Sequence, residues 1–255
     1  MKPTSELYNN LMQTSYDHFN KTLFNNSLPD IMFTIQRING VMGYFSANRW
    51  RSIKGVKCHE LAINPHYMAQ YSVIELMQTL VHEMVHCWQY CHGKPSQRNY
   101  HNKEWANKME SIGLMPSSTG RPGGKKVGQS MNDYPIPGGE FIKECRALIK
   151  QDSFTVNWID ANVRPSSLTT DKERISLLEQ ALSEENITSE ELDELTEGLS
   201  TTIGSLYDDT DEEYPAKPIN KNKTKYVCNN CEINMWGKSN LNILCMDCDI
   251  KLDEQ

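Results

Sequence analysis

The sequence predicts an α+β fold with a small metal-stabilised module near its C-terminal end. Residues 7–23 place apolar side chains at the spacing of an amphipathic helix. Residues 31–64 contain short runs rich in branched and aromatic side chains, which are typical of strands. Residues 228–248 contain two C-x-x-C pairs at a spacing that indicates a closed metal site.

Length and composition predict three segments. A chain of 255 residues can form one good core with a small appended unit. We expect a main domain over residues 1–163, an acidic linker or loosely attached arm over 164–220, and a small metal-stabilised unit over 221–255. No apolar run approaches the roughly 18 residues that suggest a membrane span. The start of the chain has no export-signal pattern, so we expect a cytoplasmic protein whose cysteines bind metal rather than form disulfides.

Charge is distributed unevenly along the chain. Residues 1–150 carry 17 Lys and Arg against 11 Asp and Glu, whereas residues 151–215 carry 3 against 17. The basic first block could face an acidic ligand, and the acidic block would repel one. Ordinary solvated surface explains both blocks equally well.

Three helices are expected in the main domain. The first begins with Thr4 or Ser5 as its N-cap and continues to Leu23. A long helix follows over residues 72–91, and a shorter one over 101–113. Short helices are also expected inside the acidic segment, in the sequences DKERISLLEQAL and SEELDELTEGL.

Strands are expected before the long helix. Residues 31–38 and 40–50 read as a hairpin across the turn signal Asn39-Gly40, and residues 60–64 as a third strand. The turn-rich segment 115–141 is expected to form loops, with a substrate-facing flap as an alternative. FTVNWID, residues 154–160, reads as a further strand.

The long helix carries the sequence VHEMVH, in which His82 and His86 lie four residues apart and Glu83 follows the first. Residues i and i+4 share one helical face, so both imidazoles can reach one zinc ion. Glu83 would lie beside the ion, where a carboxylate can act as a general base toward water. H-E-x-x-H therefore predicts a catalytic zinc site.

A catalytic zinc ion needs a third protein ligand. The candidates are His92, His101, Glu104 and Glu110. His92 has the spacing of the third metzincin histidine, but Gln89 replaces the glycine that lets the chain turn back, and a continuous helix points His92 away. His101 follows the reversal at Gly93 and Pro95, and it is the preferred ligand, with Glu104 and His92 in reserve.

Two segments carry a resemblance to a known family: TLVHEMVHCWQY and GKPSQRNYHNKEWANKMESIGLMPSSTG. They resemble the SprT-like family of zinc metallopeptidases, in particular forms encoded by phages and mobile elements. The resemblance implies a small zincin-type domain, with helices packed on a short antiparallel or mixed sheet. It also implies His82, His86 and His101 as ligands of the catalytic zinc and Glu83 as the catalytic residue. Asn102 stands where the family often has glycine.

A second metal site is predicted from the last residues of the chain. Its four ligands would be the cysteines of two knuckles, which close a tetrahedral site with no open position: Cys228, Cys231, Cys245 and Cys248. Such a zinc ion is structural, because a unit this small depends on its metal to fold. SprT-like proteins similarly end in a zinc ribbon. The other four cysteines, Cys58, Cys87, Cys91 and Cys145, are expected to be buried thiols.

The resemblance implies a zinc-dependent endopeptidase that acts on protein substrates through a metal-activated water, on or near DNA. The alternative is a nucleic-acid-binding zinc protein whose peptidase-like domain is a non-catalytic scaffold. DNA would contact the basic first block and the ribbon, where lysines accompany two aromatic residues: Lys221, Lys223, Lys225, Lys238, Tyr226 and Trp236. Tyr100, Arg121 and Tyr134 are candidates for stabilising the oxyanion. For a phage-encoded protein the location would be the host cytoplasm. Oligomeric state, protein substrate and the role of the acidic segment are left open.

Overall fold

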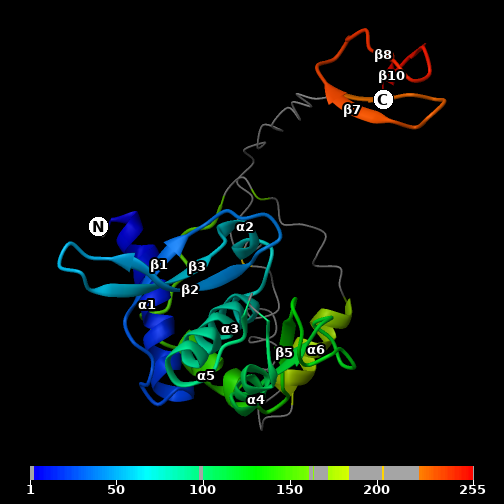
Figure 1. Cartoon of the computed structure of the whole chain (residues 1–255). Coiled ribbons are helices and arrows are strands. Elements are labelled where there is room, and N and C mark those ends of the chain that lie inside the picture. Colours follow the sequence, from blue (N-terminus) through cyan, green and yellow to red (C-terminus); the bar gives the residue numbers. More distant parts are fainter. Residues whose placement is uncertain are drawn as a thin grey trace, which may run out of the picture. The chain divides into compact units, whose positions relative to one another are not determined.

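The computed structural model describes residues 3–97, 100–160, 163, 172–183, 203 and 224–254. It has the mixed α+β character that the sequence predicts (Figure 1). The chain forms two compact units, Met1–Thr210 and Asp211–Gln255. Among the described helices, none combines the length and apolar character needed to cross a membrane.

The first unit is built on a three-stranded sheet whose order is β1-β3-β2. Strand β1 (Ile31–Ile35) runs parallel to β3 (Lys57–Ile63), and β2 (Gly43–Arg51) runs antiparallel to β3. The predicted hairpin between the first two strands is therefore wrong, because β3 lies between them. The physical reason is burial: Leu61, Ala62 and Ile63 are almost fully buried, so this strand takes the central position.

Helices α1 (Thr4–Leu23) and α3 (Val73–His92) both pack into the main core. In α1 the buried residues follow helical spacing, and Pro3 rather than Thr4 or Ser5 occupies the N-cap position. Helix α3 begins with a capping box, in which Ser72 accepts from the backbone of Glu75 and the Glu75 carboxylate accepts from the backbone of Ser72. The long helix is confirmed to within a residue or two at each end.

The remaining elements complete the first unit. They are α2 (Pro65–Met68), α4 (Lys103–Ser111), β4 (Leu114–Ser117), β5 (Asn132–Pro135), α5 (Glu140–Ile149) and α6 (Lys172–Ser183). The expectation of loops over 115–141 is wrong in part, because β4 and β5 pair antiparallel. Helix α5 was not expected, and residues 154–160 form no strand.

Helix α6 confirms the helix expected from DKERISLLEQAL, but it does not belong to a loose arm. Ala181 and Leu182 are fully buried and join the main core, and Ile203 does the same. Figure 1 shows α6 beside β5. The second predicted helix of the acidic segment lies outside the described residues. The boundary at residue 164 stays a prediction.

The second unit contains two small sheets. One has the order β10-β6-β7, formed by Asp253–Glu254, Thr224–Val227 and Asn234–Gly237. The other pairs β8 (Leu244–Cys245) with β9 (Ile250–Lys251). Its core is small, with Tyr226 and Leu252 packed beside buried cysteines.

Packing of α6 into the core can be tested by mutation. Leu182→Ala is expected to lower the free energy of unfolding of the first unit by about 2–5 kcal/mol, the usual cost of removing a buried leucine side chain. Glu179→Ala, at an exposed position of the same helix, should change it by less than about 0.5 kcal/mol. Urea unfolding followed by circular dichroism measures both. Equal, small effects would mean that α6 is not part of the core.

Candidate metal centre

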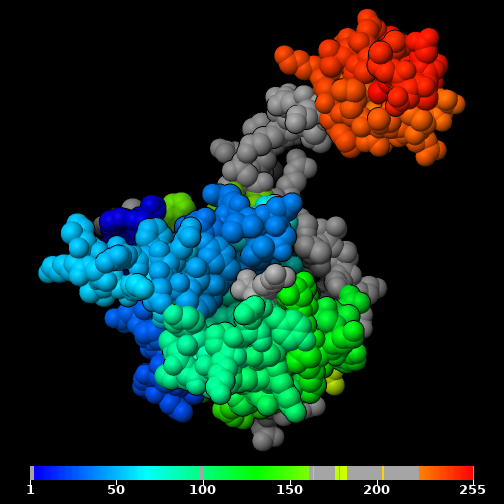
Figure 2. All heavy atoms as spheres, in the orientation of Figure 1, coloured from blue at the N-terminus to red at the C-terminus, as the bar shows by residue number. Residues whose placement is uncertain are grey.

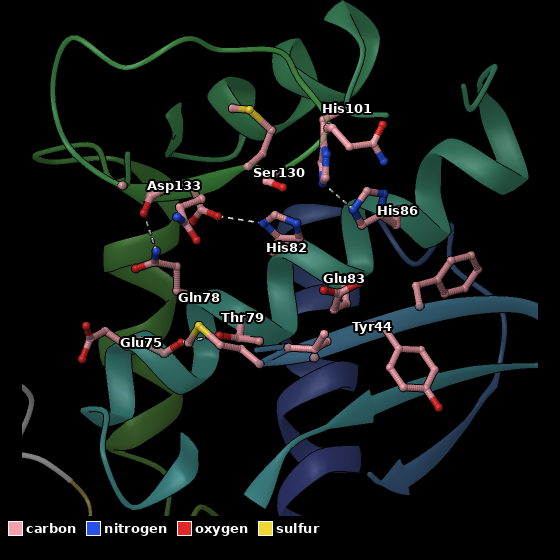
Figure 3. A pocket seen from close by; sticks show the side chains of 18 of the residues that line it. Tyr44, Glu75, Gln78, Thr79, His82, Glu83, His86, His101, Ser130 and Asp133 are labelled. Atoms are coloured by element: carbon pink, nitrogen blue, oxygen red, sulfur yellow. Dashed lines mark hydrogen bonds and ion pairs between the residues drawn. The ribbon is translucent and has the colours of Figure 1, made fainter. Parts of the chain in front are cut away.

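Two imidazoles of the centre come from consecutive turns of α3. His82 and His86 lie four residues apart, and their ring centroids are 5.2 Å from each other. Figure 3 shows both rings on the side of α3 that faces the cleft. The opposite side of the helix supplies fully buried core residues such as Leu80 and Met84. The buried face of α3 therefore fixes the direction in which the two imidazoles point.

The third imidazole is that of His101, which lies two residues before α4 rather than inside it. Its backbone forms an isolated bridge with Gly128, through hydrogen bonds of 2.9 and 3.1 Å. Its Nδ1 lies 3.2 Å from the Gly128 carbonyl, while its Nε2 lies 3.1 Å from Nε2 of His86 (Figure 3). Ligand atoms of His82, His86 and His101 all lie within 4.8 Å of one another.

Asn102 explains how the chain changes direction directly after His101. Its side-chain oxygen accepts from the backbone of Trp105 and caps α4, and its amide nitrogen donates to the Lys94 carbonyl at 3.0 Å. Asparagine at this position therefore holds the reversal between α3 and α4. Asn102, which stands where the family often has glycine, is therefore compatible with the observed reversal between the two helices.

Asp133 contacts the histidine centre, although no sequence pattern predicted it. Its Oδ2 accepts from Nδ1 of His82 at 2.8 Å, so the proton on Nδ1 is fixed and Nε2 is left to face the other imidazoles. Gln78 donates to the backbone carbonyl of Asp133 at 2.8 Å and ties β5 to α3. The only sequence signal was an acidic residue in a turn-rich segment, which is too common to be informative.

Trp105 forms the floor beneath the three histidines. It is fully buried, and its ring centroid lies 4.9 Å from His82, 5.5 Å from His86 and 4.4 Å from His101. The indole thus fills the space into which the imidazole rings could otherwise move. Its Nε1 is buried and has no hydrogen-bond partner, a cost that the packing must offset.

Burial keeps two of the three imidazoles neutral. Desolvation, reinforced by the charge of His82, lowers the pKa of His101 to about 4 and lowers the pKa of His86 well below its usual value. For His82, burial alone would lower the pKa, but the hydrogen bond to Asp133 and the charges of Glu83 and Asp133 outweigh burial and raise it. Neutral imidazole is the form that binds a metal, so the donor set fits a divalent cation and is compatible with zinc.

Glu83 lies beside the three histidines on the wall of the cleft. It is 7% exposed, and its carboxylate accepts a hydrogen bond from the backbone of Phe45 in β2. Burial raises its pKa above the usual range for a glutamate, against the opposing effects of His82 and Phe45. Figure 3 shows its carboxylate between α3 and the sheet.

The other candidate ligands point elsewhere. Glu104 Oε2 accepts from the Lys94 backbone at 2.7 Å and from the Gln89 side chain at 2.8 Å. His92 Nε2 lies 2.9 Å from the Ser27 carbonyl, and Glu110 pairs with Lys126 at 3.0 Å. The structure therefore brings together His101, and not these residues, with the first two histidines.

The centre opens into a cleft of about 1080 Å³. The cleft runs along α3 and is bordered on one side by the outer strand β2 and on the other by residues 129–135. The three residues considered for oxyanion stabilisation, Tyr100, Arg121 and Tyr134, all line it. The three histidines and Glu83 all line this cleft.

The second unit brings its four cysteines together. Ligand atoms of Cys228, Cys231, Cys245 and Cys248 lie within 4.8 Å of one another. In each knuckle the residue after the second cysteine has a positive φ, 58° at Glu232 and 52° at Asp249, and its backbone N–H donates to the carbonyl of the first cysteine. Both turns therefore fold their two thiols toward one point, as a zinc ribbon requires.

Two expectations about individual side chains are wrong. Tyr226 cannot be a stacking surface, because it is 1% exposed and its hydroxyl donates to the Lys238 carbonyl at 2.6 Å. Cys87 and Cys145 are buried as expected, but Cys91 is exposed and Cys58 is half-buried. Cys91 lies in the last turn of α3 and Cys58 near the exposed start of β3, and neither belongs to the main core. Lys221 and Lys223 lie outside the described residues.

The geometry of the first unit agrees with the comparison against protein families. Residues 12–122 match the model of the SprT-like family. The match confirms the resemblance that the sequence carries around His82, and the SprT-like segment contains all three histidines and Glu83. Asp133, α5, α6 and the cysteine unit lie beyond it.

One curated relative adds little about activity. The "uncharacterized protein in mucB 3'region" of Salmonella typhimurium is 46% identical over 48 residues, or 19% of this chain. The chain spans 64% of that relative's length. No solved structure matches the chain.

The composition of the histidine centre can be tested by metal content. His101→Ala is expected to lose one equivalent of zinc, because only two imidazoles would remain, whereas Asp133→Asn should weaken that site about 10–100-fold while keeping its ligands. His92→Ala is the matched control and should retain the wild-type content. Elemental analysis after dialysis against graded chelator measures all three. Unchanged zinc in His101→Ala would exclude this ligand set.

Proposed function

We propose that the chain is a zinc-dependent endopeptidase that hydrolyses peptide bonds of protein substrates. The observation that carries the proposal is the convergence of His82, His86 and His101 beside the buried carboxylate of Glu83, inside a cleft of about 1080 Å³. The SprT-like match supports it, because this is a metallopeptidase-like domain family. On this proposal the first unit has a zincin-type fold.

The three imidazoles would hold the catalytic zinc, and the four cysteines a structural one. When bound, the catalytic ion would act as a Lewis acid on the scissile carbonyl and lower the pKa of a water molecule. Asp133 keeps a proton on Nδ1 of His82, so that its Nε2 lone pair is directed into the centre. Four cysteine thiolates would fill the tetrahedral shell of the second ion and leave no position for water, so that ion would be structural.

Glu83 performs the proton transfers. Its carboxylate accepts a proton from the attacking water and delivers it to the nitrogen of the leaving amine. The backbone N–H of Phe45 holds the carboxylate in place, and burial raises its proton affinity, which suits a group that must both accept and release a proton. Since β2 is an outer strand that lines the cleft, a substrate can bind extended along it through backbone hydrogen bonds.

Replacing Glu83 tests this role. Glu83→Gln is expected to keep both equivalents of zinc and to lower the rate of casein cleavage by about 10²–10⁴-fold, the usual contribution of a general base. Glu140→Gln, at the exposed start of α5, is the control and should cleave at the wild-type rate. Gel assays and elemental analysis give the two readouts. Wild-type activity in Glu83→Gln would show that the chain does not use this carboxylate.

The second candidate function is nucleic-acid binding by a zinc protein. The β2–β3 hairpin favours nucleic-acid binding as a property in addition to peptidase activity. The hairpin closes tightly, with the Ser52 N–H donating to the Val56 carbonyl at 2.8 Å. Arg51 lies directly across from Lys57, a like-charge pair that costs stability unless an anion lies nearby. Trp50 and Ile53 are exposed on the same projection, which forms the lobe at the left of Figure 2.

Nucleic acid fits this hairpin better than a membrane. Residues 49–57 contain four cations and no acidic residue. Lys54 lies at the tip, where insertion into a bilayer would bury its charge. Arg49 pairs with Glu60 at 3.8 Å, whereas Arg51, Lys54 and Lys57 can contact phosphates. The exposed Trp50 can stack on a base. We therefore propose DNA or RNA as a partner at this end of the first unit.

Salt dependence tests the hairpin. The double variant Arg51→Ser/Lys57→Ser is expected to lower the slope of log affinity against log salt for single-stranded DNA by about 1.4, because two phosphate contacts are lost. Lys21→Ser/Lys143→Ser, on helices away from the hairpin, is the control and should leave the slope unchanged. Fluorescence anisotropy with the zinc-loaded full chain measures it. An unchanged slope, or binding to anionic vesicles in place of DNA, would contradict the proposal.

A further inference from the structure

One end of the cleft is apolar and lies near the beginning of α3. Its walls there include the aromatic rings of Tyr67, Tyr71 and Tyr134, together with Leu177 from α6. All four side chains are half-buried, so each leaves part of its surface open to the cleft. Leu177 is the one contribution of α6 among the described lining residues, and it lies well outside the SprT-like segment.

The wall that carries Leu177 is fixed to the first unit at two points. On α6 itself, Ala181 and Leu182 are fully buried in the main core, and the helix packs against β5. Further along the chain, Ile203 is fully buried and its backbone N–H donates to the Tyr71 carbonyl at 2.9 Å. Helix α6 therefore contributes a wall of the cleft at this end.

The polar groups at this end are already engaged with the protein. The Glu75 carboxylate accepts from the backbone N–H and from the hydroxyl of Ser72, both at 2.9 Å. The Gln78 amide donates to the Asp133 carbonyl at 2.8 Å. A charged substrate side chain placed here would lose water without gaining a matched partner, whereas an apolar one would gain from burial.

The distance from the histidines follows from the geometry of α3. Gln78 and Glu75 precede His82 by one and two helical turns, which corresponds to about 6 and 10 Å at 1.5 Å per residue. An extended peptide advances about 3.3 Å per residue. The apolar end of the cleft is therefore two to three substrate residues away from the bond beside the histidines.

We propose that Leu177, with Tyr71 and Tyr134, forms a subsite that selects a bulky apolar or aromatic side chain two to three residues from the scissile bond. The proposal rests on the proposed peptidase function. The subsite would make the peptidase selective for hydrophobic stretches of a polypeptide. Such stretches are buried in folded proteins. The enzyme would thus cleave unfolded or exposed segments in preference to intact domains.

Peptide binding to an inactive form tests the subsite apart from catalysis. The probes are fluorescent peptides that differ only in carrying Phe, Ala or Asp at one position, scanned along the peptide. The zinc-loaded Glu83→Gln chain is expected to bind the Phe peptide about tenfold more tightly than the Asp peptide at one or two adjacent positions. In this background Leu177→Ala should reduce the ratio severalfold. Leu177→Trp should fill the subsite and weaken the Phe peptide while the Ala peptide is unaffected.

The control is Glu179→Ala in the same background, because Glu179 is exposed two residues along α6. It should leave every affinity unchanged, and thermal unfolding checks that all variants are folded. Equal affinities for the Phe and Asp peptides, or ratios unaltered by both Leu177 substitutions, would overturn the subsite. If the binding pattern appears but the wild-type chain cleaves nothing, the peptidase function fails and the subsite stands. If the wild type cleaves and Leu177→Ala keeps the same residue preference, the subsite alone fails.

Discussion

The packing of three imidazoles against one buried indole is the constraint on which the first unit depends. Trp105 is fully buried and lies within 5.5 Å of each ring centroid, so the histidines cannot separate without opening the core. This places α4 against α3 and requires the tight reversal that Asn102 caps. The arrangement is stable only if the imidazoles are neutral or share a cation, and burial supplies the first condition for His86 and His101.

The same constraint explains how a helix accommodates polar side chains in an apolar surrounding. One face of α3 is buried in the core, and the other lines the cleft. Glu83 lies at the boundary, where the sheet offers a backbone N–H to its carboxylate. Burial of this carboxylate costs folding free energy, which its polar neighbours offset only in part. This position beside the three histidines is the ground on which Glu83 is proposed as a general base.

Local patterns predicted the parts of the site that are close in sequence. H-E-x-x-H specifies the positions of His82 and His86 because helical periodicity alone determines them, and each C-x-x-C specifies one knuckle. The role of Asp133 could not be predicted from the sequence, because its contact with His82 spans 51 residues and depends on the hydrogen bond that joins β5 to α3. The predicted strand order was wrong for a similar reason. The turn signal at Gly40 is local, whereas the central place of β3 depends on the packing of both sheet faces.

Composition was also misleading for α6, since the acidic character of the segment hides the two apolar residues that enter the core. The groups around the histidines consequently come from distant stretches of the chain. The imidazoles are complete by residue 101, the carboxylate that orients His82 is at 133, and the apolar wall is at Leu177, with Ile203 buried in the core behind it. During translation the histidines and Glu83 leave the ribosome first, yet the cleft cannot be complete until the chain has grown past Ile203. If the proposed peptidase function holds, this order of synthesis would delay completion of the cleft until well after the metal ligands have been made.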